Sequence, residues 1–281
     1  MNCRFWGTRG SIAVPGTDTT VYGGNTTCLE ITLGSGRKVI VDAGTGIRAL
    51  GEHLSSLSQR VDLHIIFTHI HWDHVLGFPF FRPIFEANSN IYIDGFPTCM
   101  KGLKAIFANK MGDGFFPVKF EDLKAQIEYL DALSHGSLDI DGTLIDTVPL
   151  QHPQGGYGFR FREGKKTLVF ITDNELTEEA WKGRHPDDYV EFCKGADILI
   201  HDAQFTPEEV AEHRGWGHSD YVSAFGLAQK ACVKRLVLFH HDPSRKDREL
   251  SSIEARCGDL ALGNNSLIEV EAAREGTEIS L

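Results

Sequence analysis

The segment at residues 68–74 reads T-H-I-H-W-D-H, with candidate metal ligands at His69, His71, Asp73 and His74. Histidine and aspartate at this spacing are typical of metal sites. The segment directly follows the apolar stretch 61–67, which predicts a strand, and a strand end is a rigid platform for a site. Side chains two residues apart point the same way in an extended chain, whereas neighbours diverge. The spacing therefore predicts two ions, one on His69/His71 and one on Asp73/His74.

Further candidate ligands share one position, the end of a predicted strand. They are His152 after 144–150, Asp173 after 167–172, His240 or His241 after 235–239, and Asp42 after 38–41. Each alone is an ordinary turn or surface residue, but together they indicate one site. Mixed imidazole and carboxylate ligands without cysteine suit zinc, and manganese or iron is also compatible.

The strand and helix patterns around these residues predict a mixed α/β fold. Strand patterns dominate the first forty residues, and helices alternate with strands in the second half. We expect a single domain over residues 1–281. Residues 96–132 predict a helical flap, with helices at 97–109 and 120–130 around the loop Gly112–Pro117. Whether this loop is mobile is left open.

Composition narrows the class of protein. The 281 residues include 28 Lys+Arg and 39 Asp+Glu, for a net charge of −11, and 41% are hydrophobic, which is typical of a globular protein. The acidic balance counts against a nucleic-acid partner, because phosphate contacts require Lys and Arg. No apolar run approaches the roughly 20 residues of a membrane helix, and the first residues lack the pattern of a signal peptide. The six scattered cysteines favour the cytoplasm. A homodimer is left open.

In their order along the chain, V-D-A-G at 41–44, T-H-x-H-x-D-H at 68–74, His152, Asp173 and His240 resemble the metallo-β-lactamase fold superfamily. The resemblance implies a four-layer αββα sandwich with a binuclear site. It places His69, His71 and His152 on one metal and Asp73, His74 and His240 on the other, with Asp173 bridging. His240 is preferred over His241 because the family's ligand directly follows its strand. Asp42 would orient a ligand rather than bind metal.

Later motifs resemble the phosphodiesterase branch of this superfamily, which includes the tRNA-processing enzyme RNase Z. They are I-H-D-A-Q-F at 200–205, G-H-S at 217–219 and the stretch 236–242. The resemblance makes His218 the proton donor to the leaving group and Asp202 its partner. Unlike RNase Z, the chain shows no long Gly/Pro-rich arm for tRNA. Its segments F-W-G-T-R-G-S and Y-G-G-N-T-T-C look like bacterial small-molecule phosphodiesterases, including those for cyclic nucleotides.

We therefore expect a binuclear metal-dependent phosphodiesterase that hydrolyses a small nucleotide-like diester through a metal-bridging hydroxide, with Asp73 orienting the water. Arg9, Ser11 and Asn25, in the glycine-rich N-terminal loops, are candidate phosphate contacts. A lactonase or esterase on the same site is an alternative, because a hydroxide attacks a carbonyl as readily as phosphorus. A metal-bound sensor without turnover is another, and RNase Z-like processing is less favoured.

Overall fold

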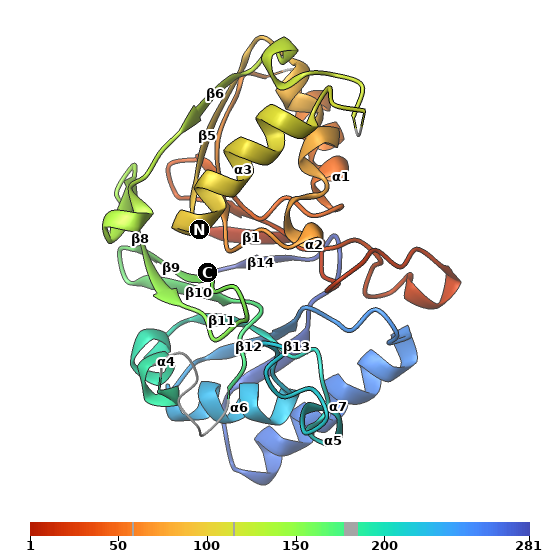
Figure 1. The fold of residues 1–281 in the computed structure, drawn as a ribbon. Coiled ribbons are helices and arrows are strands. Elements are labelled where there is room, and N and C mark those ends of the chain that lie inside the picture. The colour runs from red at the N-terminus through yellow and green to blue at the C-terminus, as the bar shows by residue number, and fades with distance from the viewer. Residues whose placement is uncertain (58, 115, 177–184) are drawn as a thin grey trace.

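A computed structural model describes residues 1–57, 59–114, 116–176 and 185–281 of the chain. Two seven-stranded sheets lie face to face, and helices cover the outer face of each (Figure 1). The four-layer αββα sandwich expected from the sequence is confirmed. The first sheet has the strand order β14-β1-β2-β3-β4-β5-β6, and the second has the order β13-β12-β11-β10-β9-β8-β7.

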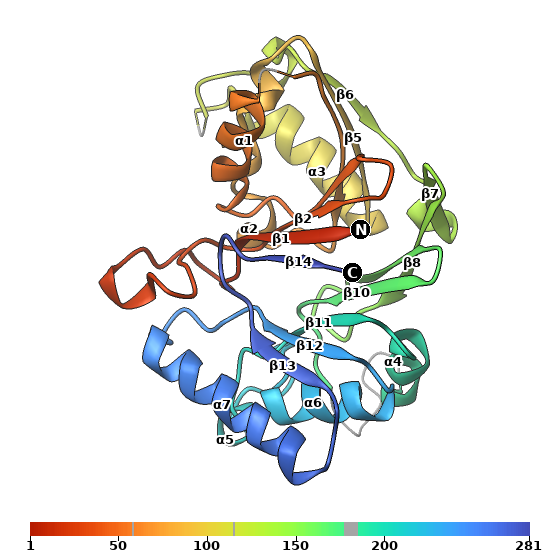
Figure 2. The ribbon, with the colours of Figure 1, turned by 180° about the vertical axis from the view of Figure 1, so that it is seen from behind.

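The strands of the first sheet are β1 (Asn2–Gly7), β2 (Cys28–Thr32), β3 (Lys38–Val41), β4 (Val61–Phe67), β5 (Ser89–Gly95), β6 (Gln126–Tyr129) and β14 (Glu278–Ser280). The strands of the second sheet are β7 (Ser137–Ile140), β8 (Thr143–Pro149), β9 (Tyr157–Glu163), β10 (Lys166–Ile171), β11 (Ile198–Asp202), β12 (Arg235–Phe239) and β13 (Glu269–Ala272). Seen from behind, β1 and β14 run side by side as an antiparallel pair (Figure 2).

The helices of the first half are α1 (Ile47–Ser56), α2 (Trp72–Val75) and α3 (Pro97–Lys110). Those of the second half are α4 (Pro186–Cys193), α5 (Pro207–Val210), α6 (Tyr221–Lys230) and α7 (Asp247–Gly263). The apolar face of α1, with Leu50 and Leu54, packs on the first sheet. In the same way α6 and α7 bury Phe225 and Leu250 against the second sheet. None of the helices among the described residues combines the length and apolar character needed to cross a membrane.

The central core lies between the two sheets. Phe5, Ile31 and Val41 from the first sheet pack in one cluster with Phe170 and Phe239 from the second. Burying large apolar side chains from both inner faces stabilises the sandwich, at roughly 25 cal/mol per Å² of apolar surface. This core fixes how the strand ends of one sheet meet those of the other.

Parallel pairing brings the functional strand ends together. In the first sheet β3 pairs parallel with β4, and in the second β10, β11 and β12 pair parallel in turn. Neighbouring parallel strands end at the same edge, so the residues that follow them become neighbours in space. The predicted ligands follow these ends, except for His152, which follows β8.

The helix predicted at 120–130 is wrong. Residues Phe120–Asp122 form a 3₁₀ turn, and Gln126–Tyr129 forms β6, which pairs parallel with β5 at the sheet edge. Ile127 and Tyr129 alternate with polar residues and pack toward the core beneath the helices of the first half. This two-residue alternation is the pattern of a strand, in which successive side chains point to opposite faces. The helix predicted at 97–109 corresponds to α3. Of the loop at 112–117, Phe115 lies outside the described residues, and Phe116 contacts Phe80 edge to face at 5.4 Å between ring centroids.

Candidate metal centre

Two clusters of histidine and aspartate side chains meet where β4, β8, β10 and β12 end. One contains His69, His71, His152 and Asp173, and the other contains Asp73, His74, Asp173 and His240. In each cluster the candidate ligand atoms all lie within 4.8 Å of one another. The structure thus brings together every residue that the sequence predicts as a metal ligand. Their role as ligands stays a prediction.

Asp173 lies between the two clusters and turns one carboxylate oxygen toward each. Its Oδ1 is 3.3 Å from Nε2 of both His74 and His240. Its Oδ2 is 3.6 Å from His69 Nε2 and 4.0 Å from His152 Nε2. This division of the two oxygens fits a carboxylate that bridges two cations.

Each of the five histidines is oriented by a partner outside the clusters. Nδ1 of His74 lies 2.8 Å from Asp42 Oδ2, and Nδ1 of His69 lies 3.0 Å from Thr68 Oγ1. Three further contacts complete the set: His71 Nε2 with Gln154 Oε1 at 2.8 Å, His152 Nδ1 with the Gly217 carbonyl at 3.3 Å, and His240 Nδ1 with Gln204 Oε1 at 2.9 Å. Such partners fix which ring nitrogen faces a metal.

The inner ring nitrogens test whether the residues fit a metal. Nε2 of His69 and Nε2 of His74 are buried and make no well-aligned hydrogen bond, although carboxylate oxygens lie 3.6 Å from the first and 3.1 and 3.3 Å from the second. An orphaned buried nitrogen is costly unless it has a ligand. Burial lowers the pKa of His74, but the nearby carboxylates of Asp73, Asp173 and Asp42 raise it well above its ordinary value. The cluster is thus a buried negative site that favours a cation, and the residues fit divalent metal.

The backbone at the site is held in an uncommon conformation. Asp42, Asp173 and His240 have φ values of 62°, 49° and 59°, in the left-handed region that non-glycine residues seldom adopt. Asp42 and His240 directly follow β3 and β12, and Asp173 lies one residue beyond β10, so all three conformations occur at strand ends that face the site. Such conformations concentrate at functional sites.

Two glycines allow close contact with the candidate ligands. A Cβ on Gly10 would lie 2.3 Å from His240 Cε1, and a Cβ on Gly217 would lie 2.1 Å from His152 Nδ1. Gly217 also has a φ of 88°, so a side chain there would be strained as well as blocked. Only glycine fits at either position without moving a histidine.

His218 and Asp202 form a pair beside the second cluster, as the sequence predicts. Nδ1 of His218 lies 2.8 Å from Asp202 Oδ2, and its ring stacks on His240 at 5.0 Å between centroids. The other carboxylate oxygen of Asp202 accepts a hydrogen bond from Ser219 N at 2.9 Å. Burial lowers the pKa of His218, but the charge and hydrogen bond of Asp202 raise it to about 9.

His240, and not His241, lies in the cluster. Nε2 of His240 is 3.2 Å from Asp73 Oδ2, whereas Nε2 of His241 hydrogen-bonds the Ala273 carbonyl at 2.9 Å. The two side chains point apart because the left-handed turn at His240 follows the strand. The structure therefore places the residue preferred from the sequence beside the other ligands.

Two of the three predicted phosphate contacts are wrong. Arg9 is fully buried and donates to the carbonyls of Gly23 and Arg245, at 2.8 and 2.7 Å. Asn25 donates to Glu275 at 3.0 Å. Both side chains hold loops together through these hydrogen bonds to loop carbonyls and to a carboxylate. Ser11 does lie at the site, through its backbone N–H, which donates to Asp73 Oδ2 at 2.8 Å.

Sequence reasoning missed the outer partners Gln154, Gln204 and Thr68, and also Glu175. The Glu175 carboxylate accepts hydrogen bonds from Gly215 N and Gly217 N, each at 3.0 Å or less, and so holds the turn that leads to His218. The available signal was position, because Thr68 begins the ligand segment and Gln154 follows His152 by two residues.

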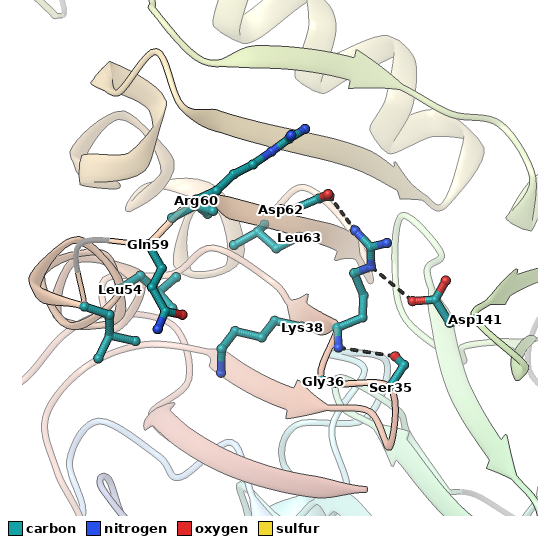
Figure 3. A pocket seen from close by; sticks show the side chains of 12 residues that line it. Ser35, Gly36, Lys38, Leu54, Gln59, Arg60, Asp62, Leu63 and Asp141 are labelled. Carbon is teal, nitrogen blue, oxygen red and sulfur yellow. Dashed lines mark hydrogen bonds and ion pairs between the residues drawn. The ribbon is translucent and has the colours of Figure 1, made fainter.

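Figure 3 shows a separate hollow of about 310 Å³. It lies at the opposite end of the strands from the clusters. It is lined by residues where β3 and β4 begin, whereas the clusters lie where these strands end. Its Arg37 pairs with Asp62 at 2.6 Å and with Asp141 at 3.2 Å, and Lys38 pairs with Glu30. These charges are already neutralised, so we place the chemistry at the clusters.

An αββα sandwich with histidine–aspartate clusters at its strand ends is the arrangement of metal-binding hydrolases of the metallo-β-lactamase fold. Residues 37–241 match the model of the beta-lactamase superfamily domain, and the chain belongs to this superfamily.

Several known proteins are similar to this chain. A ribonuclease Z of Oceanobacillus iheyensis is 25% identical over 248 residues, covering 72% of this chain and 79% of its own length. The metallo-β-lactamase fold protein YhfI of Bacillus subtilis superposes with a TM-score of 0.71 at 16% identity, over 99% of this chain and 98% of its own. A diphosphatase of the PhnP family gives a TM-score of 0.68 at 19% identity, over 100% and 97%. The chain is thus an enzyme of a hydrolase superfamily.

Proposed function

We propose that this protein is a metal-dependent phosphodiesterase that hydrolyses a small nucleotide-like diester. The first ion would be held by His69, His71 and His152, and the second by Asp73, His74 and His240, with Asp173 between them. Zinc suits this mixture of imidazole and carboxylate ligands, and manganese or iron is compatible with it. When bound, two divalent ions supply Lewis-acid stabilisation and lower the pKa of water.

The observation that carries the proposal is the His218–Asp202 pair beside the second cluster. Hydrolysis of a phosphodiester releases an alkoxide. An alkoxide is a poor leaving group, so it needs a proton as its bond to phosphorus breaks. Asp202 holds Nδ1 of His218 at 2.8 Å, which leaves Nε2 to donate that proton.

Asp73 serves the attacking water in this proposal. One of its oxygens, Oδ2, accepts the Ser11 N–H at 2.8 Å and lies 3.1 Å from His74 Nε2. The carboxylate is thus fixed in direction and can orient the water or accept its proton.

The cysteines bear on the compartment. Among the described residues, the free thiols are Cys3, Cys28, Cys193, Cys232 and Cys257. Free thiols support the cytoplasm as the compartment.

Turnover of a diester panel tests the proposal. The protein is loaded separately with zinc, manganese and iron and assayed on bis(p-nitrophenyl) phosphate and on 3′,5′-cyclic nucleotides, with and without chelator. We expect metal-dependent hydrolysis that chelator abolishes and that added metal restores. Hydrolysis of lactones without hydrolysis of any diester would support the alternative esterase chemistry and reject ours.

RNA end processing is a second candidate, because a relative that covers 72% of this chain is a ribonuclease Z. The net charge of −11 favours a small substrate, although bound cations would offset part of it. A precursor tRNA with a 3′ trailer separates the two candidates. Cleavage at the trailer with tight, salt-sensitive binding would favour RNA processing.

A further inference from the structure

Trp216 is a large aromatic side chain left exposed beside the proposed proton donor. It lies two residues before His218 and is 60% exposed to solvent. Tryptophan is highly buried on average, so an exposed one beside a candidate site is an unusual feature. Trp72, between His71 and Asp73, is also exposed, at 66%, but substituting it would disturb the candidate ligands on either side.

The turn that carries Trp216 is held rigidly. Glu175, itself only 4% exposed, accepts hydrogen bonds from the backbone N–H groups on both sides of Trp216, at Gly215 and Gly217. The Trp216 ring meets His213 edge-on at 4.8 Å between centroids, and His213 in turn stacks on Phe205 at 4.5 Å. An exposed ring fixed in this way presents a surface before any ligand arrives.

The same turn contacts the candidate metal centre and leads into the proton donor, which also packs against Phe205. The Gly217 carbonyl lies 3.3 Å from His152 Nδ1, and the Phe205 ring lies edge-on to His218 at 5.8 Å. Trp216 is therefore linked to the proton donor through the His213 and Phe205 rings, and it precedes the donor by two residues. A leaving group that takes its proton from His218 and extends along this row of rings would reach Trp216.

We infer that Trp216 stacks on the base of a nucleoside that forms the leaving side of the diester. This inference rests on the proposed function and names its substrate class. Water adds its oxygen to phosphorus and gives up a proton, the bond from phosphorus to the nucleoside oxygen breaks, and His218 supplies a proton to that oxygen. Stacking tolerates any base, because every base has a π face.

Binding of two matched phosphate monoesters, which mimic the phosphate and the nucleoside on its leaving side, tests this role. One is adenosine 5′-monophosphate, and the other is methyl β-D-ribofuranoside 5-phosphate, which has a methoxy group in place of the base. By calorimetry on the zinc-loaded full chain, we expect wild type to bind the adenosine compound about tenfold more tightly. Trp216→Ala should abolish this preference without changing the affinity for the baseless compound, and Trp216→Phe should retain most of it.

Leu267→Ala, at a residue that is 98% exposed in the loop between α7 and β13, is the control and should leave both affinities unchanged. An undiminished preference in Trp216→Ala, or an equal loss for both compounds, would overturn the inference. Turnover of the diester panel is measured independently of these binding affinities. Absence of all turnover alongside a base preference that depends on Trp216 would reject the proposed function and leave the stacking role intact.

Discussion

Asp42 Oδ2 lies 2.8 Å from Nδ1 of His74, and both side chains are completely buried. The same carboxylate also accepts the backbone N–H and the hydroxyl of Thr68, each at 2.8 Å. Asp42 therefore joins the two ends of the ligand segment beneath the metal centre. It aims Nε2 of His74 at Asp73 and Asp173.

Asp42→Asn should weaken metal binding without unfolding the protein. An amide has one acceptor oxygen where three donors converge, so one of its N–H groups would face a donor and the His74 ring would lose its fixed orientation. We expect affinity for the more weakly held ion to fall about 10- to 100-fold. Competition with a chromophoric chelator measures this, and unchanged affinity would contradict the positioning role.

Gly10→Ala should remove one ion. The new Cβ would lie 2.3 Å from the His240 ring, so the ring must leave its position facing Asp73. Metal analysis should give about one equivalent in place of two. Gly258→Ala is the matched control, because a Cβ there, inside α7, meets nothing within 4 Å. It should keep both ions and stabilise the protein by roughly 0.5–1 kcal/mol. Two equivalents in Gly10→Ala would count against His240 as a ligand.

His218→Ala should reduce the rate most where the leaving group is poor. A p-nitrophenolate leaves without help, whereas an alkoxide needs a proton. We expect a loss of about 10²–10⁴-fold in kcat on an alkyl or nucleoside diester and a much smaller loss on bis(p-nitrophenyl) phosphate. Steady-state kinetics on both substrates decides the matter, and equal losses would remove His218 from proton donation.

His64 predicts an acid-sensitive element far from the metal centre. The His64 ring stacks on Tyr92 at 4.9 Å between centroids. Burial and the nearby charge of Arg37 lower the pKa of His64 from 6.5 to about 4, although Asp62 and Asp141 act in the opposite direction. The unfolded chain therefore binds more protons between these values. The contribution of the neutral His64 side chain to the free energy of unfolding is complete above pH 6.5 and is lost as the pH falls toward 4.

His64→Phe keeps the stack and removes the titration. Between pH 7 and pH 5, wild type should lose about 1 kcal/mol more unfolding free energy than the variant, a modest difference because the ring is half-buried and partly screened by solvent. Urea denaturation of both proteins at the two pH values measures it. Parallel pH dependence in the two proteins would show that His64 does not titrate as expected.

Much of the site could be predicted because its residues follow strong local patterns. The ligand segment comes directly after the apolar strand β4, His240 comes directly after β12, and Asp173 comes one residue after β10. Once the strands are known, parallel pairing brings these positions together. The family resemblance supplied the order in which they combine and the role of His218.

The remainder depended on tertiary contacts that no local pattern records. Gln154 and Gln204 are ordinary polar residues in loops until the fold places them against His71 and His240. The edge strand β6 was mistaken for a helix because Leu123, Ile127 and Leu130 also fit helical spacing, whereas pairing with β5 decides the structure. The strands β13 and β14 are short and rich in glutamate, so composition alone did not predict them.

The candidate ligands come from both sheets, with His69, His71, Asp73 and His74 after β4 and with His152, Asp173 and His240 after strands of the second sheet. Ions held there would cross-link the two halves of the sandwich. For each site, every tenfold rise in free metal above its dissociation constant would then add about 1.4 kcal/mol to the free energy of unfolding. The supply of metal in the cell would therefore govern the lifetime of the folded chain as well as its turnover.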